Sequence, residues 1–190
     1  MKTTCTLLTL FCSLLLAGLN VASGEPATPL GKGMKIWFDT GGPVGGPYNT
    51  IVQNGATQAA ADLGVNLTLL YSEWNPENMI ANFKTALAAK PDGIVVMGHP
   101  GDDAFAPLVD EAMAGNILVT CVDTDLPRLR AKYASRGFGT IGTDPEVMGR
   151  TLAKEDLARS GVKKGDRAFV WGLKRLEERG RRARAMLKTL

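Results

Sequence analysis

Most side chains that could do chemistry in this chain stand directly after short apolar runs. Asp39 follows KIWF, His99 follows GIVVMG, and Asp123 and Asp125 follow ILVTCV. Carboxylates and an imidazole can act as general acids and bases, hold a metal ion, or hydrogen-bond the hydroxyl groups of a ligand. Their spacing and neighbours decide between these chemistries.

The spacing favours hydroxyl recognition over metal binding or catalysis. Asp123-Thr124-Asp125 lacks the further oxygen ligands and the distal glutamate that a calcium loop needs. For His99, the sequence places no partners that would make it a metal ligand or a general base. A carboxylate at a strand end can accept two hydrogen bonds from adjacent hydroxyls, as sugar recognition requires. We therefore expect no metal, no cofactor and no enzymatic activity, while an aspartate that only caps the next turn remains an alternative for Asp123.

The stretch FDTGGPVGGPYN, residues 38–49, resembles a phosphate-binding loop only in its glycine content. It contains neither G-x-G-x-x-G nor Gly-Lys-Ser/Thr, and its prolines remove backbone donors that a phosphate would use. Pro47 suits the first position of a helix. The loop is therefore expected to make a tight turn that presents Tyr48 and Asn49 to a neutral polar ligand, although a purely structural turn remains open.

Two further residues near these loops have simpler interpretations. Asp102 or Asp103, in GHPGDD, is a natural N-cap for the helix that follows. Cys121 lies inside an apolar strand pattern with no histidine close to it in sequence, so we expect a buried, inert thiol.

The elements that must position these residues alternate between strand and helix. We expect strands at 65–71, 93–98, 117–123, 139–144 and 167–172 in addition to the apolar run before Asp39, and helices at 48–63, 79–87, 105–113, 147–160 and from 175 to the end. This alternation predicts an α/β fold in which a parallel sheet carries helices on both faces. Ligands of such sheets collect at the carboxyl ends of the strands. The loops to inspect are therefore 39–49, 98–103, 123–128 and 172–179.

The ends of the chain differ in character from this core. Residues 1–23 begin with a lysine, continue through a short apolar run and end in small residues, which predicts a secretory signal peptide and an exported, periplasmic protein. Residues 24–33 are rich in glycine and proline and read as a flexible lead-in. The net charge of +3 gives no indication of a nucleic-acid partner, and the late arginine cluster is typical of a solvated helix face.

Together these pieces resemble the type I periplasmic sugar-binding proteins, the ribose- and galactose-binding group that includes autoinducer-2 binding proteins. The resemblance runs from about Lys35 to Leu190 and rests on the order of three segments. They are IWFDTGGPVGGPYNTIVQNGATQAAADLGV, PDGIVVMGHPGDDAFAPLVDEAMAGNILVTCVDTDLP and GTIGTDPEVMGRTLAKEDL. It implies a soluble, monomeric receptor that delivers a monosaccharide or polyol to a membrane ABC permease.

The resemblance also implies roles for individual residues. Tyr48 takes the place of an aromatic that stacks on the sugar ring, and Asn49 stands where the family often has a second aromatic. Asp123 matches an aspartate that binds hydroxyls, and Arg179 or Arg182 is a candidate for a cleft-facing arginine. The Asp-x-Asp of Asp123 and Asp125 is nearer the autoinducer-2 branch, but that branch has a lysine in the first loop and residues 39–49 contain none. The expected ligand-binding set is Asp39, Tyr48, Asn49, His99, Asp123, Asp125 and Arg179.

The expected domain organisation follows from the same resemblance. Residues 34–143 would form the N-terminal α/β lobe, and residues 144–190 would begin a second lobe that is incomplete. Because two full domains need a longer chain, we expect a fragment of a longer receptor. An exported sensor that presents its ligand to a chemoreceptor or kinase, and an exported α/β enzyme, are the alternative functions.

Overall fold

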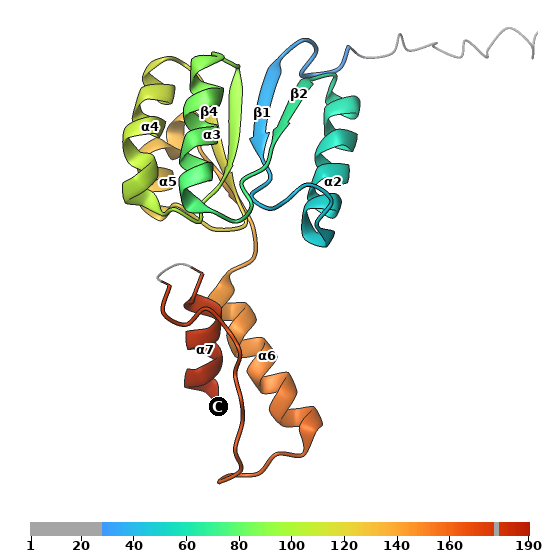
Figure 1. The fold of residues 1–190 in the computed structure, drawn as a ribbon, viewed down its shortest axis with the longest axis vertical. Helices are drawn as coiled ribbons and strands as arrows, with labels where there is room; N and C mark the ends of the chain where they lie inside the picture. Colours follow the sequence, from blue (N-terminus) through green and yellow to red (C-terminus); the bar gives the residue numbers. More distant parts are fainter. Residues whose placement is uncertain (1–27, 177–178) are drawn as a thin grey trace, which may run out of the picture.

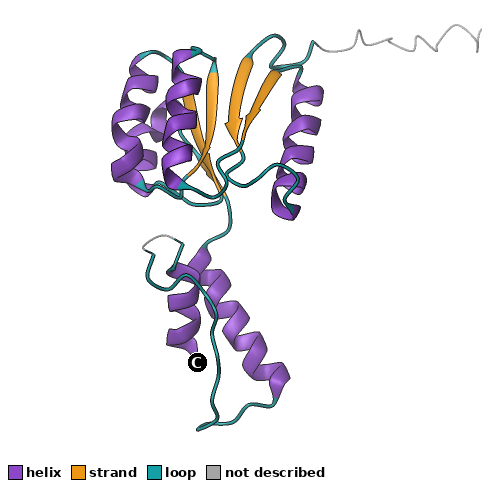
Figure 2. Ribbon diagram, viewed as in Figure 1, coloured by secondary structure: helices purple, strands orange, loops and turns teal. Residues whose placement is uncertain are grey.

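The computed structural model describes residues 28–176 and 179–190. Its centre is a five-stranded sheet in which every neighbouring pair is parallel (Figures 1 and 2). The strand order is β2-β1-β3-β4-β5. The strands are β1 (Lys35–Asp39), β2 (Asn66–Leu70), β3 (Gly93–Met97), β4 (Leu118–Val122) and β5 (Thr140–Ile141). The predicted α/β fold with a parallel sheet is confirmed.

Helices cover the two faces of this sheet unequally. Figure 1 shows α2 (Pro47–Leu63) on one side, and α3 (Pro76–Ala88), α4 (Asp102–Ala114) and α5 (Pro127–Tyr133) on the other. Pro47 occupies the first turn of α2, and Gly64 ends the helix in the left-handed conformation with φ of 70°, as the sequence predicted. Asn75 caps α3 by accepting hydrogen bonds from the backbone N–H groups of Glu77 and Asn78.

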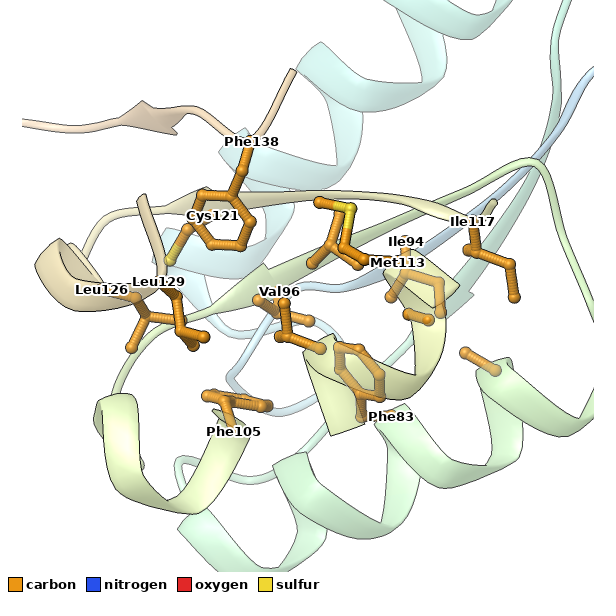
Figure 3. Close-up of a cluster of buried hydrophobic side chains, with 14 of the residues drawn as sticks. Phe83, Ile94, Val96, Phe105, Met113, Ile117, Cys121, Leu126, Leu129 and Phe138 are labelled. Carbon is orange, nitrogen blue, oxygen red and sulfur yellow. The ribbon is translucent and has the colours of Figure 1, made fainter. Parts of the chain in front are cut away.

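The main hydrophobic core lies between α3, α4, α5 and strands β3 and β4 (Figure 3). Phe83 and Phe105 meet there with ring centroids 5.7 Å apart. Cys121 is fully buried, and burial raises the pKa of its thiol to about 12. The expectation of an inert strand cysteine is therefore confirmed. This core fixes the carboxyl ends of β3 and β4, after which three of the expected site residues follow: His99, Asp123 and Asp125.

The chain leaves the sheet after β5 and forms the C-terminal segment, residues 142–176 and 179–190. In it α6 (Pro145–Ser160) packs along α7 (Arg181–Thr189), below the sheet in Figure 1. Asp144 caps α6 through the N–H groups of Glu146 and Val147. The predicted boundary near Thr143-Asp144 thus falls on the connection between β5 and α6.

The predicted sixth strand at 167–172 is wrong. These residues have no regular secondary structure, and Phe169 and Trp171 remain 89% and 83% exposed. A strand requires a neighbour for its backbone hydrogen bonds, and the five-stranded sheet does not include this segment. Residues 167–172 therefore have the apolar pattern of a strand, but they do not pair with a strand of this sheet.

Three boundaries also differ from expectation. The short helix α5 was not predicted, and the basic helix starts at Arg181 rather than near residue 175. The expected flexible lead-in ends in an ordered turn, because the N–H groups of Gly31 and Gly33 donate to the carbonyls of Leu63 and Gly64 at 2.8 and 3.0 Å. The signal peptide predicted over residues 1–23 lies outside the described residues.

Candidate functional site

Four side chains from four different loops meet at the carboxyl edge of the sheet. Tyr48 begins α2 after the glycine loop, Trp74 follows β2, His99 follows β3 and Asp123 follows β4. In Figure 1 the carboxyl ends of the strands face the C-terminal segment. Ligands of parallel sheets bind at this edge, which includes loops that the sequence predicted. The loop after β2, which carries Trp74, was not among them.

The glycine loop lets the backbone pass closely under this cluster. Gly41 has φ of +84°, and a Cβ there would collide with the Met97 side chain. A Cβ on Gly42 would collide with Asn49 Oδ1 and would lie 2.6 Å from the Trp74 indole. The loop thus makes the expected tight turn, and its backbone lies close to the side chains of Met97, Asn49 and Trp74.

Three rings stand side by side above this loop. The centroids of Tyr48 and Trp74 are 5.3 Å apart with planes tilted by 59°, and those of Trp74 and His99 are 5.8 Å apart and stacked at 29°. Tyr48 is 41% exposed, whereas the His99 side chain is 4% exposed. The cluster therefore presents a partly open aromatic corner backed by a buried imidazole.

Asp123 joins both ends of this row of rings. Its Oδ2 lies 3.2 Å from His99 Nε2, and its carboxylate is close enough to the Tyr48 hydroxyl to raise the pKa of that group. The hydrogen bond from His99 is the main cause that lowers the pKa of Asp123, and the hydrogen bond from Thr124 adds to it. Burial and the neighbouring carboxylate of Asp123 raise the pKa of Tyr48 to about 12, so its hydroxyl stays a donor at neutral pH. Asp123 has φ of 63°, and it is not the N-cap residue of the following helix, α5, because that residue is Leu126.

Two buried acceptors beside the rings have no hydrogen-bond partner. Asn49, 1% exposed, donates from Nδ2 to Thr40 Oγ1 at 2.8 Å, and Thr40 Oγ1 donates to the Leu70 carbonyl, which fixes the orientation of the amide. Asn49 Oδ1 is then left unpaired, and so is His99 Nδ1. Because Asp123 only accepts, His99 Nε2 carries the hydrogen and Nδ1 offers a lone pair. Groups of this kind would suit the hydroxyls of a ligand.

Asp39 and Asp125, both expected to bind ligand, are engaged by other parts of the protein. Asp39, 5% exposed, accepts hydrogen bonds from the Gly41 N–H, the Ser72 hydroxyl and Asn82 Nδ2. Asp125 forms an ion pair with Arg130 at 2.8 Å and accepts a hydrogen bond from Thr140. Their partners hold the loops after β1 and β4 in place.

The aspartates of the loop after β3 also have a different role from the expected one. Gly101 is the N-cap residue of α4. Asp102 instead accepts hydrogen bonds from the backbone N–H groups of Arg128 and Leu129 at 3.3 and 2.9 Å, so it caps the neighbouring helix α5. The expectation that Asp102 or Asp103 caps its own helix is wrong.

Arg182 is the arginine whose charge reaches the cluster. It lies in α7 and helps to lower the pKa of Asp123. Arg179, the residue expected in this role, lies half-buried in the turn before α7. One helical turn separates the two positions, and the sequence could not fix the start of that helix.

Sequence reasoning missed Trp74 altogether. The signal was available, because Trp74 follows a predicted strand and the rule on strand ends applies to that loop as well. Among the described residues, no group of three or more histidines, cysteines or acids could hold a metal ion, and no helix is long and apolar enough to cross a membrane.

Comparison with known proteins matches residues 42–181 to the periplasmic binding protein domain. Among solved structures, a periplasmic solute-binding protein of an ABC transporter from Actinobacillus succinogenes with bound D-allose is 24% identical, with a TM-score of 0.67 over 83% of this chain and 55% of that one. A glucose-galactose binding protein from Geobacillus stearothermophilus is 23% identical, with a TM-score of 0.64 over 83% and 54% of the two chains. A periplasmic sugar-binding protein from Legionella pneumophila is 27% identical, with a TM-score of 0.58 over 67% and 46%.

No curated protein sequence matches the chain. The chain spans about half the length of the solved structures that it resembles. The match of the domain model extends over most of the chain, from the glycine loop to the start of α7, and it includes Tyr48, Trp74, His99 and Asp123. The chain therefore belongs to the periplasmic binding protein domain family.

Proposed function

We propose that the chain is part of an extracytoplasmic solute-binding protein that captures a monosaccharide or related polyol for an ABC importer. One observation carries this proposal: Tyr48, in the first turn of α2, and Asp123, after β4, lie close enough for the Asp123 carboxylate to raise the pKa of Tyr48, and both side chains are about 40% exposed. A ligand could therefore contact both side chains from solvent. A ring that can lie on the apolar face of a sugar stands beside a carboxylate that can accept its hydroxyls.

The residues divide into ligand contacts and supports. In this proposal Tyr48, His99, Asp123 and Asn49 contact the ligand, and Asp39 and Asp125 position the loops through their buried hydrogen bonds and ion pair. Arg182, or Arg179 after a small rotation of α7, would reach the ligand from the C-terminal segment. Binding then needs no nucleophile and no cofactor, in keeping with a family of substrate-binding domains.

The proposal extends to export and to closure. Residues 1–23 would direct the chain to the periplasm, where the monomeric receptor would meet its membrane permease. The connection from Gly142 to Asp144 would act as the hinge between the N-terminal lobe, residues 34–143, and a second lobe begun by residues 144–190. Similar proteins named for D-allose and for glucose and galactose support a neutral sugar as the ligand.

An NMR titration of the chain with neutral monosaccharides tests this function. D-allose, D-glucose, D-galactose and their open-chain alcohols would be added up to millimolar concentration, since a site built largely from one lobe is expected to bind weakly. Saturable shifts with at least one of these compounds, lost in Asp123→Ala, are expected. Shifts with none of them, in this chain and in a version extended by a second lobe, would contradict the proposal.

A further inference from the structure

Trp74 lies at the candidate site, although it was not among the predicted ligand-binding residues. The residue beside Tyr48 is Asn49, which is buried and lies next to the Trp74 indole over Gly42. The loop after β2 brings a second ring to Tyr48 from a different direction. We propose that Trp74 is a ligand-contacting, specificity-determining residue that forms the second wall of the sugar site. This inference rests on the proposed sugar-binding function and deepens it.

The arrangement of the rings gives this wall its shape. Tyr48 and Trp74 meet at 59° with centroids 5.3 Å apart, which leaves no room for a sugar between them. They form the two sides of a corner instead. His99 stacks behind Trp74 and fixes the indole from its other side. A cyclic sugar can place its C–H groups in such a corner, whereas a flexible open-chain polyol would lose more conformational freedom on binding.

The backbone around Trp74 holds the indole as a fixed wall. Trp74 has φ of 59°, a conformation that bulky residues rarely adopt. Its N–H donates to the Gly41 carbonyl at 2.7 Å. The next residue, Asn75, donates to the Ser72 carbonyl at 2.8 Å and caps α3 with its side chain. Backbone hydrogen bonds at Trp74 and Asn75 therefore fix the main chain that carries the indole before any ligand arrives.

The polar groups next to Trp74 define the ligand's chemistry. Asn49 Oδ1 shares the space over Gly42 with the indole, and His99 Nδ1 belongs to the ring that stacks on it. Both atoms are buried acceptors without partners. With the carboxylate of Asp123 they form three acceptors around the aromatic corner. A neutral ring bearing several hydroxyl donors fits this set, and a sugar phosphate or sugar acid would place negative charge against Asp123.

Two substitutions of Trp74 separate ring contact from packing. Trp74 also packs against the hydrophobic core, so truncation to alanine would combine both effects. Trp74→Phe keeps an aromatic face, and Trp74→Leu keeps apolar volume without one. We expect the phenylalanine variant to bind D-allose, D-glucose or D-galactose within about threefold of wild type and the leucine variant about tenfold more weakly, with similar melting temperatures. Trp37→Phe, in β1, is the matched control and should leave affinity unchanged.

A fluorescence titration gives a second readout. In the variant Trp37→Phe/Trp171→Phe, Trp74 is the remaining tryptophan, and a bound sugar should change its emission with the dissociation constant found by NMR. Wild-type affinity in Trp74→Leu, or emission that stays constant while the sugar binds, would overturn the role of Trp74 and leave the proposed function intact. Failure of the wild-type chain to bind any of these sugars would overturn the proposed function, and this inference with it.

Discussion

His99 Nε2 and Asp123 Oδ2 lie 3.2 Å apart, although 24 residues separate them in the chain. This hydrogen bond ties the ends of β3 and β4 together at the edge of the sheet where the aromatic corner stands. It also fixes the tautomer of His99 and leaves its Nδ1 as a buried acceptor. In the proposed function, these two residues would serve as an oriented pair of hydrogen-bonding groups for a ligand.

Replacing Asp123 should remove sugar binding with little effect on folding. Asp123→Ala leaves ligand hydroxyls and His99 without their acceptor, which costs about 1–3 kcal/mol for each unpaired group. Affinity measured by NMR or calorimetry should fall at least tenfold. The matched control is Asp103→Ala, because Asp103 is 93% exposed and pairs only with the surface residue Arg128 in the described structure. Equal losses in the two variants would remove Asp123 from the site.

The pKa of Asp123 predicts how binding depends on pH. Its pKa in the folded protein is lower than the ordinary value of 3.8, first because His99 donates a hydrogen bond to it. A depressed carboxyl pKa adds stability above the unfolded value and loses it as the pH falls through the folded value. The contribution of the Asp123 carboxylate to affinity should therefore be lost only below about pH 4. NMR titration of the Asp123 carboxyl should give a midpoint below 3.8 that rises in His99→Gln, and a midpoint at or above 3.8 in the wild type would contradict the geometry.

Tyr48 should titrate at unusually high pH. Burial, and then the charge and hydrogen bond of Asp123, raise its pKa to about 12. Because the folded pKa is raised, the contribution to stability is present below the unfolded value of 10.0 and is lost as the pH rises through the folded value. NMR of labelled tyrosine should show Tyr48 neutral at pH 11, and Asp123→Asn should move its midpoint back towards 10. A midpoint near 10 in the wild type would show that the two groups are apart in solution.

How much of this site the sequence could predict depends on which contacts are local. The boundaries of α2 followed from Pro47 and Gly64, whose backbone preferences act within a few residues. The interior strands followed from continuous apolar runs, which parallel strands covered on both faces require. Tyr48, His99 and Asp123 followed from the position of strand ends.

Contacts between distant residues account for the errors. Asp39 accepts hydrogen bonds from Ser72 and Asn82, 33 and 43 residues away, so its residue type alone could not show these contacts. Asp102 caps a helix 25 residues downstream. The segment 167–172 had the composition of a strand, but its pairing depends on other parts of a sheet. Trp74 follows a predicted strand, but its contacts with Tyr48 and His99 bring together residues from other parts of the chain.

The Asp39 cluster should control stability rather than recognition. Asp39→Ala leaves the buried Ser72 hydroxyl, the Asn82 amide and the Gly41 N–H without their acceptor, and we expect about 2–4 kcal/mol of destabilisation. Thermal or urea unfolding measures this loss. Asp62→Ala, on the exposed face of α2, is the control and should change the free energy of unfolding by less than 0.5 kcal/mol, in the range of about ±0.5 typical of surface positions. A stable Asp39→Ala protein that has lost sugar binding would reassign Asp39 as a ligand contact.

Alanine substitutions at Gly42 and Gly55 should have opposite effects on the stability of the protein. At Gly42 the new Cβ would collide with Asn49 and the Trp74 indole, so Gly42→Ala should lower both stability and affinity. At Gly55, within α2, a Cβ meets nothing within 4 Å, so Gly55→Ala should stabilise the helix by about 0.5–1 kcal/mol. Unfolding curves of the two variants test the pair. A Gly42→Ala protein as stable as wild type would show that the rings do not lie over this loop.

The most direct test of the account is whether Tyr48 and Asp123 respond together to one ligand. In an NMR titration with the tightest-binding neutral sugar, we predict that the Tyr48 ring, the Trp74 indole and the Asp123 carboxyl shift with a single dissociation constant, while Gly161 at the far end of α6 remains unchanged. Shifts confined to one of these side chains, or centred on α6, would contradict a shared sugar site at the carboxyl edge of the sheet.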